Sequence, residues 1–298
     1  MSIIVDEGTK VLVQGITGRF GEFVTRSILD TGTKVLAGVT PGKGGESVWG
    51  VPVYDTVKQA IEKQGEIDAT LIVVPGPDAK KAALEAFDAV IGTVLMEVER
   101  VPLHDALELI AYAQKTGIRL LGPGSGGVVS PGKGSLGMFG SPEELARIVW
   151  VPGRIGVISR SGGQTSTLAW AICSTGLGIS TAVSLGSEPI LGTTFPELLA
   201  LFQADDETDG VVYYGEIGTV MEEEAAELIK RGGYTKPLVA HIAGRGLPSG
   251  LRFSHASAIV EGGKGTAESK IEALQDAGVY IADKPEDLSA IIAKVFRK

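Results

Sequence analysis

Short apolar runs rich in β-branched residues alternate with longer amphipathic segments along this chain of 298 residues. Apolar residues repeat with different periods in strands and helices, so the runs are predicted strands and the longer segments predicted helices. Strands that alternate with helices form right-handed βαβ units and therefore parallel sheets. We predict an α/β protein, with strands at 11–15, 34–39, 69–76, 93–98, 119–122, 154–160, 179–185, 210–214, 237–243 and 279–282.

A segment rich in glycine and proline interrupts the alternation between residues 123 and 153. Glycine and proline mark turns and boundaries, and a chain of this length usually folds as two domains. We therefore predict two doubly wound domains, at 1–122 and 154–298, joined by the segment 123–153. In such sheets, ligands bind beyond the carboxyl ends of the strands, which is where most of the glycine clusters fall.

Charge and composition narrow the classes of partner. The net charge is −9 and there is no long basic run, which argues against nucleic acid as a partner. The single Cys173 excludes an internal disulfide and suits a reducing compartment. No apolar stretch approaches the roughly 20 residues of a membrane span, and the first residues do not resemble a signal peptide. We expect a cytoplasmic protein without a membrane segment.

Two glycine-rich loops follow the first two predicted strands. Gly15, Gly18 and Gly21 precede a predicted helix, whose free N–H groups suit an anion. Their spacing is not GxGxxG, and no acidic residue ends the second strand, so an NAD-linked dehydrogenase is disfavoured. Another phosphate-bearing nucleotide is the favoured ligand, and a glycine turn that only packs is the alternative. Lys43, in the second loop, has the charge to pair with a phosphate.

Two further clusters lie later in the chain. Residues 121–127, with the following Ser130 to Lys133, form part of the connecting segment and stand where they can also line a site. Ser161 and the next two glycines precede another predicted helix, which favours a second anion site. A serine nucleophile is disfavoured there, because the GxSxG pattern is absent.

The chain contains three histidines. We interpret His104 as a solvated side chain on a surface helix and His241 as a satisfied core residue. His255 lies in a long loop beside small residues, where a substrate-facing and a merely structural role are equally compatible with the pattern. Glu216 ends a predicted strand, where its carboxylate would either orient a histidine ring or cap the next helix.

Nine strings in the chain together resemble the α subunit of succinyl-CoA synthetase, from about Val5 to Val295. They are QGITGRFGEF, GVTPGKGG, VPVYDTV, GVVSPG, GRIGVISRSGG, GEIG with EEEAAELIK, KPLVAHIAG, SHASAIV and GGKGTAESKIEALQDAGV. Each string alone is weak, but nine in the family's order and spacing are specific.

The resemblance implies a Rossmann-like CoA-binding domain followed by a flavodoxin-like ligase domain. It implies that His255 is phosphorylated and that Glu216 contacts it. The residues implied to bind CoA are Thr17, Gly18, Arg19, Phe20, Lys43, Glu97, Val98, Glu99 and Ser125. Those implied to meet the transferred phosphate or the acid are Ser161, Gly162, Gly163 and Ser166. No metal site is expected in this chain.

The family chemistry passes the γ-phosphate of ATP or GTP to His255 and then to a carboxylic acid, and the CoA thiol attacks the resulting acyl phosphate. Histidine suits this relay, because a phosphoramidate keeps most of the driving force. The chain has no P-loop and no nucleotide-grasping domain. The resemblance therefore implies a β subunit, in an αβ or α₂β₂ assembly, that holds the nucleotide and Mg²⁺.

The chain departs from the family pattern near the acid. Ser125 replaces a cysteine, Ser166 replaces a tyrosine, and the arginine that holds citrate in citrate-specific relatives is absent near Glu188. Succinate is the expected acid by family frequency, and malate or citrate are alternatives. A non-catalytic CoA-binding regulatory protein is an alternative of another class, which His255 and Glu216 together disfavour.

Overall fold

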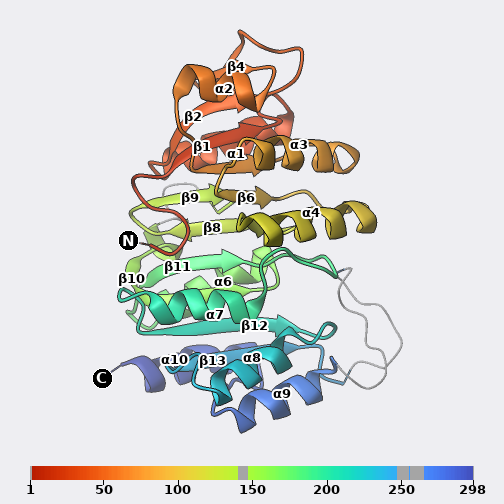
Figure 1. Ribbon diagram of the computed structural model, residues 1–298. Coiled ribbons are helices and arrows are strands. Elements are labelled where there is room, and N and C mark those ends of the chain that lie inside the picture. Colours follow the sequence, from red (N-terminus) through yellow and green to blue (C-terminus); the bar gives the residue numbers. More distant parts are fainter. Residues whose placement is uncertain (1, 140–146, 247–254, 256–264, 298) are drawn as a thin grey trace. The chain divides into compact units, whose positions relative to one another are not determined.

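A computed structural model describes residues 2–139, 147–246, 255 and 265–297 (Figure 1). The chain divides into two compact units. The first unit spans residues 4–142 with 190–193, and the second spans 1–3, 143–189 and 194–298. The division falls inside the segment that we predicted to connect two domains, and the predicted boundaries at 122 and 154 stay predictions.

The first unit is built on a sheet that is parallel except for its edge strand β3, and helices cover the sheet (Figure 1). Its strand order is β3-β4-β2-β1-β5-β6-β7. Its elements are β1 (Lys10–Gln14), α1 (Arg19–Asp30), β2 (Lys34–Val39), β3 (Ser47–Val48), β4 (Val51–Tyr54), α2 (Val57–Gln64), β5 (Ala69–Ile72), α3 (Gly76–Asp88), β6 (Thr93–Met96), α4 (Leu103–Thr116), β7 (Arg119–Leu121), β8 (Gly127–Ser130) and β9 (Gly134–Gly137).

The order of strands reverses at β1, which pairs in parallel with β2 on one side and β5 on the other. From β4 to β7 this is the Rossmann order, in which the crevice for a ligand opens beside the first strand. The loops that follow β1, β2, β5, β6 and β7 therefore share one edge of the sheet. This edge carries the glycine loops that the sequence singled out.

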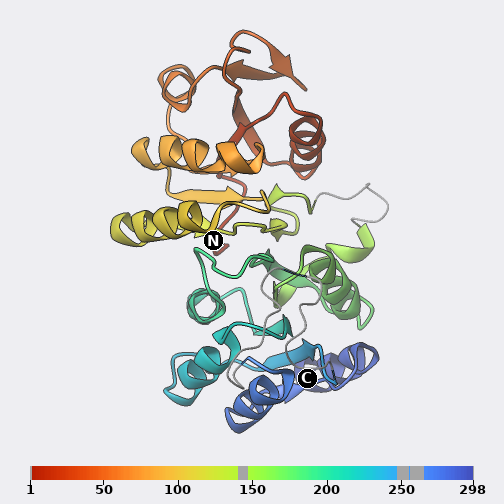
Figure 2. The same ribbon diagram turned by 90° about the vertical axis from the view of Figure 1, so that its right-hand side faces the viewer.

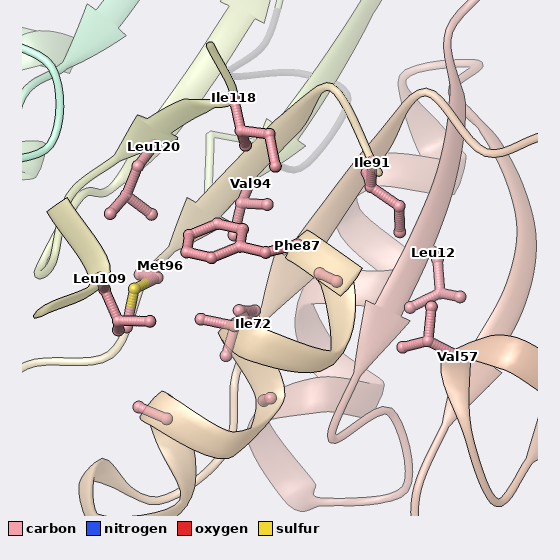
Figure 3. Close-up of a cluster of buried hydrophobic side chains, with 14 of the residues drawn as sticks. Leu12, Val57, Ile72, Phe87, Ile91, Val94, Met96, Leu109, Ile118 and Leu120 are labelled. Atoms are coloured by element: carbon pink, nitrogen blue, oxygen red, sulfur yellow. The ribbon is translucent and has the colours of Figure 1, made fainter. Parts of the chain in front are cut away.

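An apolar core joins one face of this sheet to α2, α3 and α4 (Figure 3). Phe87 of α3 is buried at its centre, and its ring stacks on Tyr112 of α4 with a centroid distance of 5.1 Å. Alanines on α3 let the helix approach the strands closely. The other labelled members of the core are Leu12, Val57, Ile72, Ile91, Val94, Met96, Leu109, Ile118 and Leu120.

The predicted connecting segment contains an antiparallel hairpin, which the sequence analysis did not anticipate. β8 and β9 pair from Gly127 with Gly137 to Ser130 with Gly134. Glycine is required at the open end, because a Cβ on Gly127 would lie 2.3 Å from the carbonyl oxygen of Leu136. The glycines that suggested a linker therefore serve a close approach of two backbones.

The second unit has the parallel strand order β14-β13-β12-β10-β11, which is the flavodoxin order. Helix α6 packs with α10, while α7, α8 and α9 pack in a row, and Figure 2 shows helices on both sides of this sheet. Its elements are β10 (Pro152–Ser159), α6 (Gly162–Cys173), β11 (Ile179–Ser184), α7 (Phe195–Ala204), β12 (Gly210–Glu216), α8 (Met221–Lys230), β13 (Leu238–Ala243), α9 (Ala267–Asp276), β14 (Tyr280–Ile281), a 3₁₀ turn (Pro285–Asp287) and α10 (Leu288–Phe296).

The predicted α/β class is confirmed, and some element ends differ. The strand predicted at 69–76 ends at Ile72, because Pro75 caps α3 and Gly76 begins it. The strand predicted at 210–214 continues to Glu216, since its backbone pairs with β13 up to Ala243. Among the described helices, none combines the length and apolar character that crossing a membrane requires.

Candidate functional site

The turn between β1 and α1 has the geometry of an anion-binding loop. Gly15 has a φ of +86°. A Cβ on Gly21 would lie 2.1 Å from the carbonyl oxygen of Gly15, so only glycine lets α1 begin this close to the strand. Gly18 caps the helix without a side-chain hydrogen bond, and Arg19 and Phe20 are exposed in the first turn. The helix start therefore faces solvent with its positive dipole end.

The second glycine loop lies against the first. The hydroxyl of Thr17 donates to the hydroxyl of Thr40 at 3.1 Å. The Asp55 carboxylate accepts the amides of Gly42 at 2.7 Å and Gly44 at 3.0 Å, which fixes the loop around Lys43. The structure thus brings Thr17 and the loop of Lys43 together, as the sequence suggested. The Lys43 ammonium is half exposed and forms an ion pair with Glu46 at 3.0 Å.

Residues that follow β6 form the other end of this edge. The amide of Gly124 donates to Val98 O at 2.9 Å, and the amide of Ser125 donates to Met96 O at 3.2 Å. Ser125 is buried, and its hydroxyl accepts the amide of Gly127 at 3.1 Å. The predicted ligand residues 97–99 and Ser125 are therefore neighbours, although Glu99 is exposed and the Glu97 carboxyl points inward.

The Glu97 carboxyl is buried without a hydrogen-bond partner among the described residues. Burial raises the pKa of Glu97 to about 8, and the nearby amide of Met138 opposes only part of this effect. That amide donates its own hydrogen bond to Gly126 O at 3.1 Å. Burial therefore favours the neutral form of the Glu97 carboxyl, which no feature of the sequence signals.

The stability of the first unit should consequently depend on pH through Glu97. From the ordinary pKa of 4.5 to about 8, the folded state keeps a proton that the unfolded chain has released. Stability is therefore lost as pH rises through this window. We expect Glu97→Gln to match the wild type at pH 5 and to exceed it by up to about 4 kcal/mol at pH 9. Urea unfolding at both pH values measures this difference. The exposed Glu99→Gln is the control, and parallel curves for Glu97→Gln and wild type would contradict the assignment.

The second unit carries the other predicted site at its own reversal of strand order. β10 lies between β11 and β12, so the loop after Ser159 and the end of β12 are adjacent. Ser161 caps α6 with extended backbone, and the helix begins at Gly162, two residues earlier than predicted. The Ser161 hydroxyl makes no cap hydrogen bond to the helix. The Ser161 amide donates to the Ser159 hydroxyl at 3.0 Å. Ser166, one turn further along α6, is half-buried.

His255 and Glu216 meet at this edge. The His255 Nδ1 lies 2.9 Å and 2.8 Å from the two carboxylate oxygens of Glu216. Glu216 is 9% exposed, and the His255 side chain is 24% exposed. A carboxylate at Nδ1 holds the proton on that nitrogen and leaves Nε2 with its lone pair. The sequence proposed both residues, and the structure places them in contact across 39 positions of the chain.

The turn after Glu216 also holds both flanks of the segment that carries His255. On one flank, Gly244 packs on Ile217, where a Cβ would lie 2.6 Å from Ile217 Cγ2. On the other flank, the Gly218 amide donates to Gly265 O at 2.8 Å. The end of β12 therefore contacts the histidine ring through Glu216, and the turn that follows contacts both flanks of the His255 segment.

Arg160 belongs to the same site and was missed from the sequence. Its side chain is 1% exposed, although it stands between Ser159 and Ser161 in the sequence. Its Nε lies 3.9 Å from Glu216 Oε1, an oxygen that His255 Nδ1 also contacts. A charged residue at the end of an apolar strand could have indicated a site residue, but the sequence does not predict that Arg160 is buried.

The other two histidines take the roles that we expected. His241 is buried in β13, and its Nδ1 lies 2.9 Å from Ala282 O. His104 is exposed on α4. Neither histidine is in contact with Glu216.

Two family descriptions match the chain, "CoA binding domain" over residues 6–99 and "CoA-ligase" over residues 158–280. Fold and site thus define a CoA-binding ligase chain. Subunit alpha 2 of ADP-forming succinate–CoA ligase from Archaeoglobus fulgidus is 46% identical over 295 residues, which cover 99% of this chain and 100% of the relative. A subunit of an ADP-forming sulfoacetate–CoA ligase from an Acholeplasma species is 43% identical, covering 99% and 98%. The chain belongs to the family of succinate–CoA ligase alpha subunits and their close relatives.

Among solved structures, ATP citrate lyase from Methanothrix soehngenii in complex with citrate and coenzyme A has the same fold. The TM-score is 0.91 at 24% identity, over 99% of this chain and 50% of that chain. This chain thus spans half the length of the lyase chain, and the likeness shows the fold alone.

The residues of the first unit fit the phosphates of CoA. The uncapped start of α1 lies beside exposed Arg19, and exposed Lys43 is on the adjoining loop. A Cβ atom placed on Gly42 or Gly45 would meet no heavy atom within 4 Å outside the adjacent residues. The second loop is therefore open to a ligand at these positions.

Proposed function

We propose that this chain is the alpha subunit of an ADP-forming carboxylic acid–CoA ligase that carries the transferred phosphoryl group on His255. The contact between His255 Nδ1 and the Glu216 carboxylate, at the reversal of strand order in the second sheet, carries this proposal. A ring fixed in this way presents Nε2 as a nucleophile.

The proposed relay uses the residues of the second unit in three ways. His255 Nε2 attacks the γ-phosphorus of ATP, so that an N–P bond forms, the P–O bond to ADP breaks, and Nδ1 keeps its proton toward Glu216. The same nitrogen then gives the phosphoryl group to the acid. The start of α6 at Gly162 and Gly163 supplies amides and a helix dipole for the transferred charge.

In this proposal, CoA binds at Thr17–Phe20 and Lys43, and residues 97–99 and Ser125 lie nearby. The CoA thiol attacks the acyl phosphate and accepts the acyl group. We propose that a beta subunit with a nucleotide-grasping domain holds ATP and Mg²⁺, and that the assembly works in the cytoplasm. Both relatives named above are subunits of ADP-forming ligases, which supports this proposal.

Succinate and sulfoacetate are the acids to test first, because those are the substrates in the names of the two relatives. Both carry two anionic groups, so the site near Ser166 must accept a second charge. Malate and citrate come next, because the replacement of a family tyrosine by Ser166 leaves room for a hydroxyl or a bulkier acid.

The test uses the chain purified with its beta subunit. We expect γ-labelled ATP to label this chain with an acid-labile, alkali-stable phosphate, and CoA with the correct acid to discharge the label. Both alternatives bind CoA, so calorimetry with CoA does not separate them, whereas phosphate labelling does. CoA binding without any labelling would identify a non-catalytic CoA-binding protein instead.

A further inference from the structure

Arg160 is a buried guanidinium that lies 3.9 Å from the carboxylate that holds His255. Its Nη2 donates to the backbone oxygen of Glu188 at 3.3 Å, and Nη1 reaches the sulfur of Met221 at 3.9 Å. Its Nε has no hydrogen-bond partner among the described residues. An arginine stays charged in any protein environment, so a positive charge is fixed beside Glu216.

Other ionisable side chains of the neighbouring elements, among the described residues, have contacts of their own. From α8 and α9, Glu222 and Lys270 form a buried ion pair, and the Tyr213 hydroxyl donates to Glu222 at 2.7 Å. On β12, burial first and the charge of Glu216 second raise the pKa of Tyr214, which stays a neutral phenol. From β13, His241 is bound to Ala282 O and tilts against the Tyr214 ring.

We propose that Arg160 is a positioning residue for phosphoryl transfer, whose fixed charge balances Glu216 and keeps His255 a neutral nucleophile. This inference rests on the proposed function. A lone carboxylate at 2.8 Å would favour the imidazolium, in which Nε2 carries a proton and cannot attack phosphorus. Arg160, whose Nε lies 3.9 Å from the same carboxylate, opposes that protonation.

The direction of each substitution follows from these charges. Glu216→Gln leaves the Arg160 cation unbalanced near the ring, so His255 should protonate only at lower pH. Arg160→Met removes this positive charge from beside the carboxylate, so His255 should protonate at higher pH. The double variant Arg160→Met with Glu216→Gln removes a neutral pair, so the midpoint should return toward the wild-type value.

Histidine ring NMR of the full chain measures the midpoint directly. The chain has only three histidines, and His255→Asn assigns the signal. We expect shifts of about one pH unit or more, down for Glu216→Gln and up for Arg160→Met. In the assembled enzyme, the acid limb of the rate of His255 phosphorylation should move in the same directions, and Arg160→Lys should restore it.

The double variant keeps the test decisive if Arg160→Met does not fold, because it contains no unpaired buried charge. A double variant whose midpoint equals that of Glu216→Gln would overturn the proposal. So would an Arg160→Met enzyme that slows phosphorylation equally at every pH. The proposed function is judged separately, by whether the wild-type chain takes up phosphate at all.

Discussion

A chain in which asparagine replaces His255 is expected to take up no phosphoryl group from ATP and to lose ligase turnover by more than about 10³-fold. The reason is chemical. Asparagine offers an amide in place of Nε2, and an amide nitrogen has no free lone pair with which to attack phosphorus. Glu216 remains in place, so the variant removes the nucleophile and leaves the carboxylate and its buried neighbours intact. Acid-labile label and CoA-dependent ADP release are the two measurements.

His104→Asn is the matched control, because this histidine is exposed on α4 of the first unit. It should keep both label and turnover at the wild-type level. A His255→Asn enzyme that still forms acid-labile phosphate would place the nucleophile elsewhere. A wild-type enzyme that turns over without any labelled intermediate would exclude the relay altogether.

Lys270→Met is expected to lower the free energy of unfolding by about 3–5 kcal/mol. The Lys270 side chain is fully buried, and its ammonium pairs with the equally buried Glu222 and lies 3.8 Å from Glu223 Oε2. Removing the ammonium leaves the Glu222 carboxylate charged in a buried site, where the Tyr213 hydroxyl is its remaining hydrogen-bond partner among the described residues. Because a buried unpaired charge is far more costly than a lost surface contact, the effect should be among the largest of any single substitution. Urea unfolding at pH 7 measures it.

The pair also joins α8 to α9, and α9 starts next to the flank of the His255 segment. Glu223 accepts the amide of Gly265 at 3.3 Å and the hydroxyl of Ser269 at 2.9 Å. Adding Glu222→Gln to Lys270→Met should recover much of the lost stability, since neither buried charge then remains. Lys80→Met is the comparison, because the Lys80 ammonium is solvated beside Asp105 and Glu108 and its loss should change stability little. Equal losses for the two lysine variants would show that burial is not the cause.

Sequence patterns predicted most of the helices and strands because each depends on local periodicity. α7 and α9 begin and end where the apolar period and the caps Thr194 and Thr266 place them. The β8–β9 hairpin escaped prediction, since its strands contain few β-branched residues and its glycines resemble a linker. What makes them strands is the close backbone approach at Gly127 and Gly137. That contact exists only when the two segments meet.

The sequence by itself determined the α/β class, the glycine loops at strand ends and the choice of His255 over two other histidines, the last through the family resemblance. Tertiary structure alone decided the distances at which His255 meets Glu216, the position of Arg160 at 3.9 Å from the same carboxylate, and the burial of Glu97 and Lys270. The reason is physical. Helical and strand periods are local properties of a chain, whereas the charge state of an ionisable side chain depends on the atoms that exclude water from it. Those atoms come from strands and helices that are distant in the sequence and adjacent only in the folded sheet.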